Sequence, residues 1–102
     1  MSERLIKLYF TGEQRPDIVD ALMQVDNLSG FTLYAIEGFS HRQDRFDLDE
    51  QIRGSRSMYS AEVICNDKTF TEIKASLKKL NFNEPLRYYV TELSEQGCIE
   101  AN

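Results

Sequence analysis

The chain has 102 residues, of which 41% are hydrophobic and 28% charged, and its 12 lysines and arginines against 17 acidic residues give a formal net charge of −5. This length suits a single domain, 1–102. The acidic balance argues against nucleic acid as a partner, because phosphate binding requires a surplus of cationic side chains.

Nothing in the sequence predicts export or a membrane span. The N-terminal "MSERLIKLYF" lacks the apolar core of a signal peptide, and no run reaches the roughly 18 apolar residues that a spanning helix needs. Two cysteines, Cys65 and Cys98, do not make a secreted disulfide framework. We therefore expect a cytoplasmic protein with no direct membrane insertion.

The first half of the chain predicts a strand, a helix and a second strand. Residues 4–10 alternate with apolar side chains on both faces, which favours a central strand. Residues 15–30 change to a helical period, with Pro16 in the first turn and Gly30 as the stop. The apolar face of this helix would contain Ile18, Leu22 and Val25, widened by Val19 and Met23. Residues 31–37 read as the next strand.

The second half repeats this order. Residues 57–65 predict a strand, with an inner row made of Tyr59, Ala61, Val63 and Cys65. Residues 69–80 predict a helix, since Thr69 and Glu72 have capping-box spacing and apolar residues recur at helical intervals. Residues 86–93 supply the fourth strand, and 98–100 could add a short edge strand. The order predicts an α+β, ferredoxin-like βαββαβ fold with a four-stranded antiparallel sheet and both helices on one face.

The face of the sheet without helices would not be polar, because tyrosines and leucines must be distributed across both faces. Such a surface would exceed the few hundred Å² of apolar patch that monomers usually expose. Association of identical subunits is the simplest way to cover it, so we predict a homo-oligomer.

A long charged insertion, residues 39–56, separates the second and third strands. Its arginines are offset by acids, and Leu48 and Ile52 lie four residues apart, which predicts one short helix near 48–53. Two interpretations remain open. These hydrophobes and the arginines that flank them form a recognition element for a protein or an anionic ligand, or the loop packs onto a neighbouring subunit. The arginines are Arg42, Arg45, Arg53 and Arg56.

The borders of this insertion resemble those of the T-loop in nitrogen regulatory PII signalling proteins. In that family the second strand leads into a glycine-phenylalanine-glycine-arginine-glutamine run, and an arginine-glycine pair opens the third. Here Gly38, Phe39, Arg42 and Gln43 match the first part, with Ser40-His41 in place of one glycine, and Arg53-Gly54 match the second. The resemblance implies a protein that contacts its partners through this loop.

Three further segments are similar to a PII-like branch, the DUF3240 family: "SGFT" at 29–32, "EQIRGSR" at 50–56 and "LRY" at 86–88, which contains Arg87. The resemblance implies a homotrimer, with the sheets lining the centre and the three loops projecting. It also implies a regulatory partner. Members of this branch are associated with heavy-metal efflux systems, which makes a membrane transporter a candidate partner.

The sequence departs from PII proteins where they bind ATP or ADP. The connection between the second helix and the fourth strand is "NFNEP", residues 81–85, without glycine or lysine. A phosphate site needs closely presented backbone N–H groups or cations, so nucleotide binding in the PII mode is not expected here. The resemblance makes Gln43 the match to a glutamine that helps hold magnesium and 2-oxoglutarate in PII.

A divalent metal is the alternative ligand. His41 lies near Asp44, Asp47 and Asp49, but one histidine with acids matches neither a structural zinc pattern nor an EF-hand, which favours an ordinary loop residue. Solvated carboxylates and a single histidine also give little basis for catalysis, so we predict that the protein is not an enzyme. The sequence thus favours a trimeric PII-like regulator that senses a small ligand or metal state, and the alternative is a metal-binding tolerance protein of similar fold.

Overall fold

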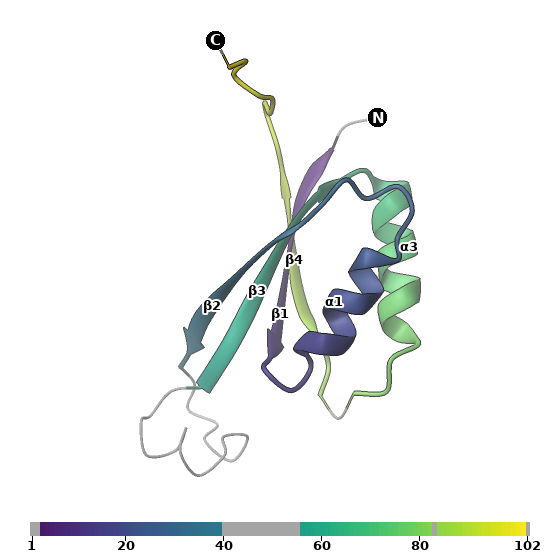
Figure 1. Cartoon of the computed structure of the whole chain (residues 1–102), viewed down its shortest axis with the longest axis vertical. Helices are drawn as coiled ribbons and strands as arrows, with labels where there is room; N and C mark the ends of the chain where they lie inside the picture. The colour runs from purple at the N-terminus through teal and green to yellow at the C-terminus, as the bar shows by residue number, and fades with distance from the viewer. Residues whose placement is uncertain (1–2, 40–55, 83, 102) are drawn as a thin grey trace.

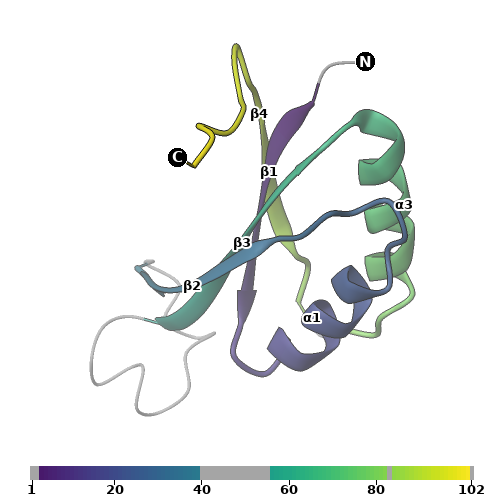
Figure 2. The same ribbon diagram turned by 45° about the horizontal axis from the view of Figure 1, so that its top comes forward.

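The computed structural model of the protein describes residues 3–39, 56–82 and 84–101 (Figure 1). Its elements follow the order β1 (Arg4–Thr11), α1 (Arg15–Met23), β2 (Thr32–Gly38), β3 (Arg56–Cys65), α3 (Asp67–Lys78) and β4 (Arg87–Glu92). The strands form one antiparallel sheet in the order β2-β3-β1-β4, and both helices cover the same face (Figure 2). The predicted ferredoxin-like fold is confirmed.

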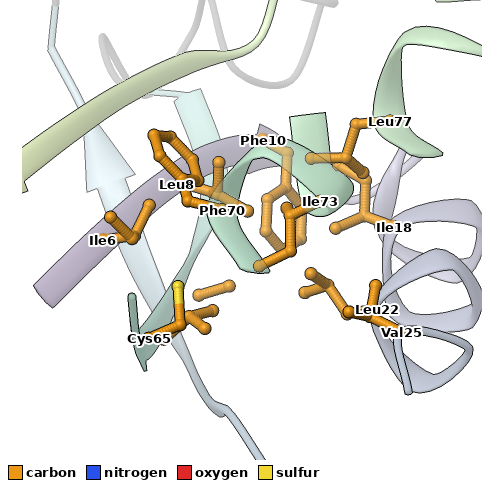
Figure 3. Close-up of a cluster of buried hydrophobic side chains, with 12 residues drawn as sticks. Ile6, Leu8, Phe10, Ile18, Leu22, Val25, Cys65, Phe70, Ile73 and Leu77 are labelled. Atoms are coloured by element: carbon orange, nitrogen blue, oxygen red, sulfur yellow. The ribbon is translucent and has the colours of Figure 1, made fainter. Parts of the chain in front are cut away.

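The core lies between the sheet and the two helices (Figure 3). Alternate residues of β1 point into it, because successive side chains of a strand face opposite sides. Ile6, Leu8 and Phe10 are almost completely buried there, as are Ile18 and Leu22 from α1. From α3 the core receives Phe70, Ile73 and Leu77, and the predicted inner row of β3 faces the same space.

Helix α1 is shorter than predicted. It ends at Met23 rather than running to Gly30, and Met23 is 72% exposed, so its predicted place on the apolar face was wrong. After the helix the backbone continues through tight turns, in which the N–H of Val25 donates to Leu22 O and that of Leu28 to Val25 O. These i to i−3 bonds bring Val25 to the core without another helical turn.

Helix α3 begins earlier than predicted. Asn66 is its N-cap, and its side-chain Oδ1 accepts a hydrogen bond from the backbone N–H of Thr69 at 2.9 Å. The predicted capping box at Thr69 and Glu72 was therefore wrong. Asparagine is among the strongest N-cap residues. Asn66 therefore accepts a hydrogen bond from a free N–H at the start of the helix, and Thr69 lies inside the first turn instead of at the cap.

The C-terminal segment differs from the prediction as well. Residues 93–101 contain no strand, so the predicted edge strand at 98–100 was wrong. Throughout the described parts of the chain, no helix is both long and apolar enough to cross a membrane.

Candidate functional site

The helix-free face of the sheet is a continuous surface contributed by all four strands. We define this face by the residues that alternate with the core row and by their partners in the register. It consists of Leu5, Lys7, Tyr9 and Thr11 of β1, Thr32, Tyr34 and Ile36 of β2, Met58, Ser60, Glu62 and Ile64 of β3, and Arg87, Tyr89 and Thr91 of β4.

Aromatic and aliphatic side chains from all four strands lie on this face, and several of them remain accessible. The rings of Tyr9 and Tyr89 meet edge to face, with centroids 5.6 Å apart and an interplanar angle of 81°. Tyr34 is 40% exposed, Ile64 41% and Tyr89 51%. Large side chains on neighbouring strands, each half exposed, form the kind of apolar patch that marks an interaction surface.

A polar group occupies the centre of the same face. Lys7 Nζ lies 3.6 Å from Glu62 Oε2, and the Tyr34 hydroxyl donates a hydrogen bond to the Glu62 carboxylate. This bond raises the pKa of Tyr34, because deprotonation would place a second negative charge beside Glu62. Ser60 lies between Tyr9 and Tyr34 in the register and is almost completely buried. The face therefore combines accessible apolar side chains with a charged pair at its middle.

The insertion leaves the sheet at one end, where β2 stops and β3 starts. Gly38, the last residue of β2, pairs with Arg56, the first of β3, and Phe39 follows at 73% exposure. At the same end, Arg87 opens β4 opposite Tyr9 on the helix-free face. The two strands thus place both ends of the insertion at the same end of the sheet, the lower end of β2 and β3 in Figure 1.

A second arginine lies near this end, on the helix side. The guanidinium carbon of Arg15 is 4.7 Å from the centre of the Tyr59 ring, and that ring stacks on Phe10 with centroids 6.2 Å apart. Arg15 is the first residue of α1, where the helix dipole disfavours a cation. The contact with Tyr59 offsets that cost and fixes the guanidinium beside the sheet.

Most of the predicted loop residues lie outside the described part of the chain. These are His41, Arg42, Gln43, Arg45, Leu48, Ile52 and Arg53, together with the predicted short helix at 48–53. Gly38, Phe39 and Arg87 are described and share one end of the sheet, and Arg56 is placed there by its backbone. Their roles remain predictions.

The described residues offer little for metal or nucleophilic chemistry. Among them, no group of three histidine, cysteine, aspartate or glutamate side chains is arranged to hold a metal ion. Burial raises the pKa of the Cys65 thiol, with smaller contributions from Glu3 and Asp67, which keeps the sulfur protonated and unreactive. Cys98 is exposed.

Sequence reasoning missed two features of this site. The contact of Arg15 with Tyr59 joins residues 44 positions apart, and no local pattern indicates it. The group of Lys7, Glu62 and Tyr34 depends on the register of three strands. The signal available in the sequence was one charged residue among the apolar ones in the interior of each of β1 and β3, Lys7 and Glu62. Residues of opposite charge on neighbouring strands prefer to lie opposite each other.

Solved structures with the same architecture place this fold in a known class. A nitrogen regulatory PII-like protein, CPII, from Thiomonas intermedia K12, solved with ADP, AMP and bicarbonate, superposes with a TM-score of 0.69 at 9% identity over 97% of this chain and 98% of that one. At this identity the similarity shows the fold alone, and the fold is that of PII-like proteins.

The sequence identifies the family. The family model described as a protein of unknown function, DUF3240, matches residues 1–100, and the chain belongs to this family. A DUF3240 protein from Shewanella baltica OS155 has a TM-score of 0.78 at 25% identity, covering 98% of this chain and 99% of that one. A search of curated proteins gave no match.

Proposed function

We propose that the protein is a homotrimeric PII-like regulator, which senses a small ligand or metal state and contacts a protein partner through the insertion at 39–56. The PII-like fold supports a regulatory role in general terms. The partner class implied by the family resemblance is a heavy-metal efflux transporter.

The helix-free face is the observation that carries this proposal. Tyr9, Tyr34, Tyr89 and Ile64 form an accessible apolar surface around the Lys7–Glu62 pair. Burial of such a face stabilises an assembly by about 25 cal/mol for each Å² of apolar surface removed from water. β2 ends at Gly38 and β3 begins at Arg56 at one end of the sheet, so we expect subunits that pack through the face to leave their insertions available for other contacts.

The described residues at the base of the insertion suit a protein contact. Phe39 exposes an aromatic side chain, and Arg15 and Arg87 lie at the same end of the sheet. Aromatic residues and arginine are enriched where protein interfaces bind most strongly. An acidic segment with apolar residues is the partner surface that would complement this base.

A pull-down compares the intact protein with a variant that lacks residues 42–53. Each is immobilised and exposed to detergent-solubilised membranes that contain the transporter. We expect the intact protein to retain the transporter and the deletion variant to lose it, while light scattering gives both the same mass. Equal retention by both proteins would contradict the role of the insertion.

A point variant tests the base of the insertion with a matched control. Phe39→Ala removes an aromatic side chain that is 73% exposed at this end, and Met23→Ala removes a methionine side chain that is 72% exposed on α1. We expect the first to weaken retention about tenfold or more, as for an interface residue that contributes about 1.4 kcal/mol, and the second to leave it unchanged.

Calorimetry separates the ligand classes. Titration with ATP, ADP and cyclic nucleotides tests the PII ligands, for which we expect weak binding because residues 81–85 lack glycine and lysine. Titration with copper, zinc and cobalt tests the metal alternative. Micromolar or tighter binding that is lost in His41→Ala would favour a metal-binding tolerance protein instead.

A further inference from the structure

A groove with a volume of about 450 Å³ lies between α3 and the start of β4, on the opposite side of the sheet from the helix-free face. Its floor is apolar and comes from Leu8, Phe70, Leu77, Leu80, Phe82, Pro85, Leu86 and Tyr88. Phe70 and Tyr88 meet edge to face, with ring centroids 5.3 Å apart, and Tyr88 remains 46% exposed. Tyr88 therefore offers accessible apolar surface beside an edge strand of the sheet, above a floor in which Phe70 and Leu77 are each 8% exposed.

Two lysines border this groove. Lys74 Nζ lies 4.6 Å from the centre of the Phe70 ring, and Lys78 follows one helical turn later. Glu84 is the acidic residue in the lining. The excess of positive charge at the rim favours an occupant that combines an apolar side chain with carboxylates.

The C-terminal segment of the chain has that composition. Residues 93–101 contain Glu95 and Glu100 but neither lysine nor arginine. Between the two acids, Ile99 is 100% exposed. A fully exposed isoleucine next to an acid complements an apolar groove with lysines at its rim.

In this structure the segment lies away from the groove of its own subunit. Gln96 Nε2 donates a hydrogen bond to Glu3 Oε1, which holds the segment at the end of the sheet where β4 finishes (Figure 1). The three residues from Gln96 to Ile99 span at most about 11 Å. The groove lies at the other end of β4, whose six residues alone extend about 20 Å.

We propose that the groove between α3 and β4 binds the C-terminal segment of a second copy of this chain, with Ile99 seated on Phe70, Leu77 and Tyr88 and with Glu95 and Glu100 near Lys74 and Lys78. This contact rests on the proposed assembly and adds a second interface to it. The interface is heterologous, because a segment meets a groove, and such contacts close into a ring when the rotation between subunits allows it.

Cys98, the native cysteine next to Ile99, allows the contact to be tested by disulfide cross-linking. Lys78→Cys places a second thiol at the rim of the groove, and mild oxidation then links it to Cys98 of another copy if the segment lies there. We expect covalent dimers and larger closed species on non-reducing gels. Met23→Cys, at an exposed position on α1, is the matched control and should give about tenfold less product.

Additional variants and a mass measurement make the result decisive. Adding Cys98→Ser should abolish the product, and adding Ile99→Asp should reduce it about tenfold or more, since burial of one isoleucine changes an equilibrium by that order. Three outcomes would overturn this contact alone. They are equal linking in the Lys78→Cys and Met23→Cys proteins, a link within one chain, and no link in a protein that is trimeric by light scattering. A single-chain mass for the unmodified protein would instead overturn the proposed assembly.

Discussion

The two faces of the sheet are built from the same strands but are completed in different ways. On the helix side, Ile6, Leu8 and Phe10 of β1 are covered by α1 and α3 to at most 2% exposure. On the opposite side, the alternate residues Lys7 and Tyr9 are only half-buried. Each face contains one row of the same alternation, yet within residues 3–39, 56–82 and 84–101 the helices cover one row only.

This difference shows that a row of apolar residues in a strand predicts burial, but does not indicate whether helices of the same chain or another subunit cover it. The helix side is completed within one chain, because α1 and α3 contribute Ile18, Leu22 and Ile73 at complementary positions. The other face combines tyrosines, which retain a polar hydroxyl, with the Lys7–Glu62 pair. Side chains of this mixed kind tolerate water before assembly and still contribute apolar area after it.

Truncation on the two faces of β1 gives the largest expected contrast. Phe10→Ala leaves a cavity beside Tyr59 and should lower the free energy of unfolding by about 3–5 kcal/mol. Tyr9→Ala removes the edge-to-face contact with Tyr89 and should cost about 1 kcal/mol within one chain. Urea denaturation monitored by circular dichroism measures both changes.

Protein concentration sharpens this contrast. The effect of Phe10→Ala should be the same at every concentration, whereas that of Tyr9→Ala should grow with concentration, because the lost contact includes other subunits. Equal and concentration-independent losses would show that both faces are completed within one chain.

A smaller effect is expected at the start of the covering helix α3. Asn66→Ala removes the acceptor for the Thr69 N–H and should lower the free energy of unfolding by about 1 kcal/mol. Asn66→Asp keeps an acceptor and should remain close to the original stability. If Asn66→Ala were neutral in urea denaturation, the capping assigned to this residue would be wrong.

The smallest effect concerns pH and the polar centre of the helix-free face. The pKa of Tyr34 is raised from 10.0 in the folded protein, so its contribution to stability is complete below about pH 10 and is lost as the pH rises through the folded value. Between pH 9 and pH 11 the unmodified protein should therefore lose more stability than Tyr34→Phe. Identical losses in thermal unfolding at the two pH values would contradict the hydrogen bond to Glu62.

The fold was predictable because periodicity and element order are properties of the sequence. The alternation in β1 and the helical spacing of Phe70, Ile73 and Leu77 were enough to give the topology. Element boundaries were less predictable, since they depend on which local hydrogen bonds prevail. At α3, Asn66 and not Thr69 is the N-cap. After Met23, tight turns take the place of the last predicted helical turns and still bring Val25 to the core.

The candidate site was predictable only in part. The length of the insertion and the residues Gly38 and Phe39 predicted where it leaves the sheet, between β2 and β3, and its role as a binding site stays a prediction. The contact of Arg15 with Tyr59 and the hydrogen bond of Tyr34 to Glu62 join distant positions, so they required the strand register. The groove under Tyr88 likewise depends on how α3 packs beside β4.

The molar mass of the protein in solution tests the central claim most directly. Light scattering at micromolar concentration should give three times the 11.9 kDa mass of one chain. Tyr89→Glu, which places a charge on the helix-free face, should reduce the mass to that of one chain, while Val90→Glu at a 38% exposed position on the helix side should leave the trimer intact. A mass of 11.9 kDa for the unmodified protein, or an undiminished trimer in Tyr89→Glu, would contradict an assembly built on that face.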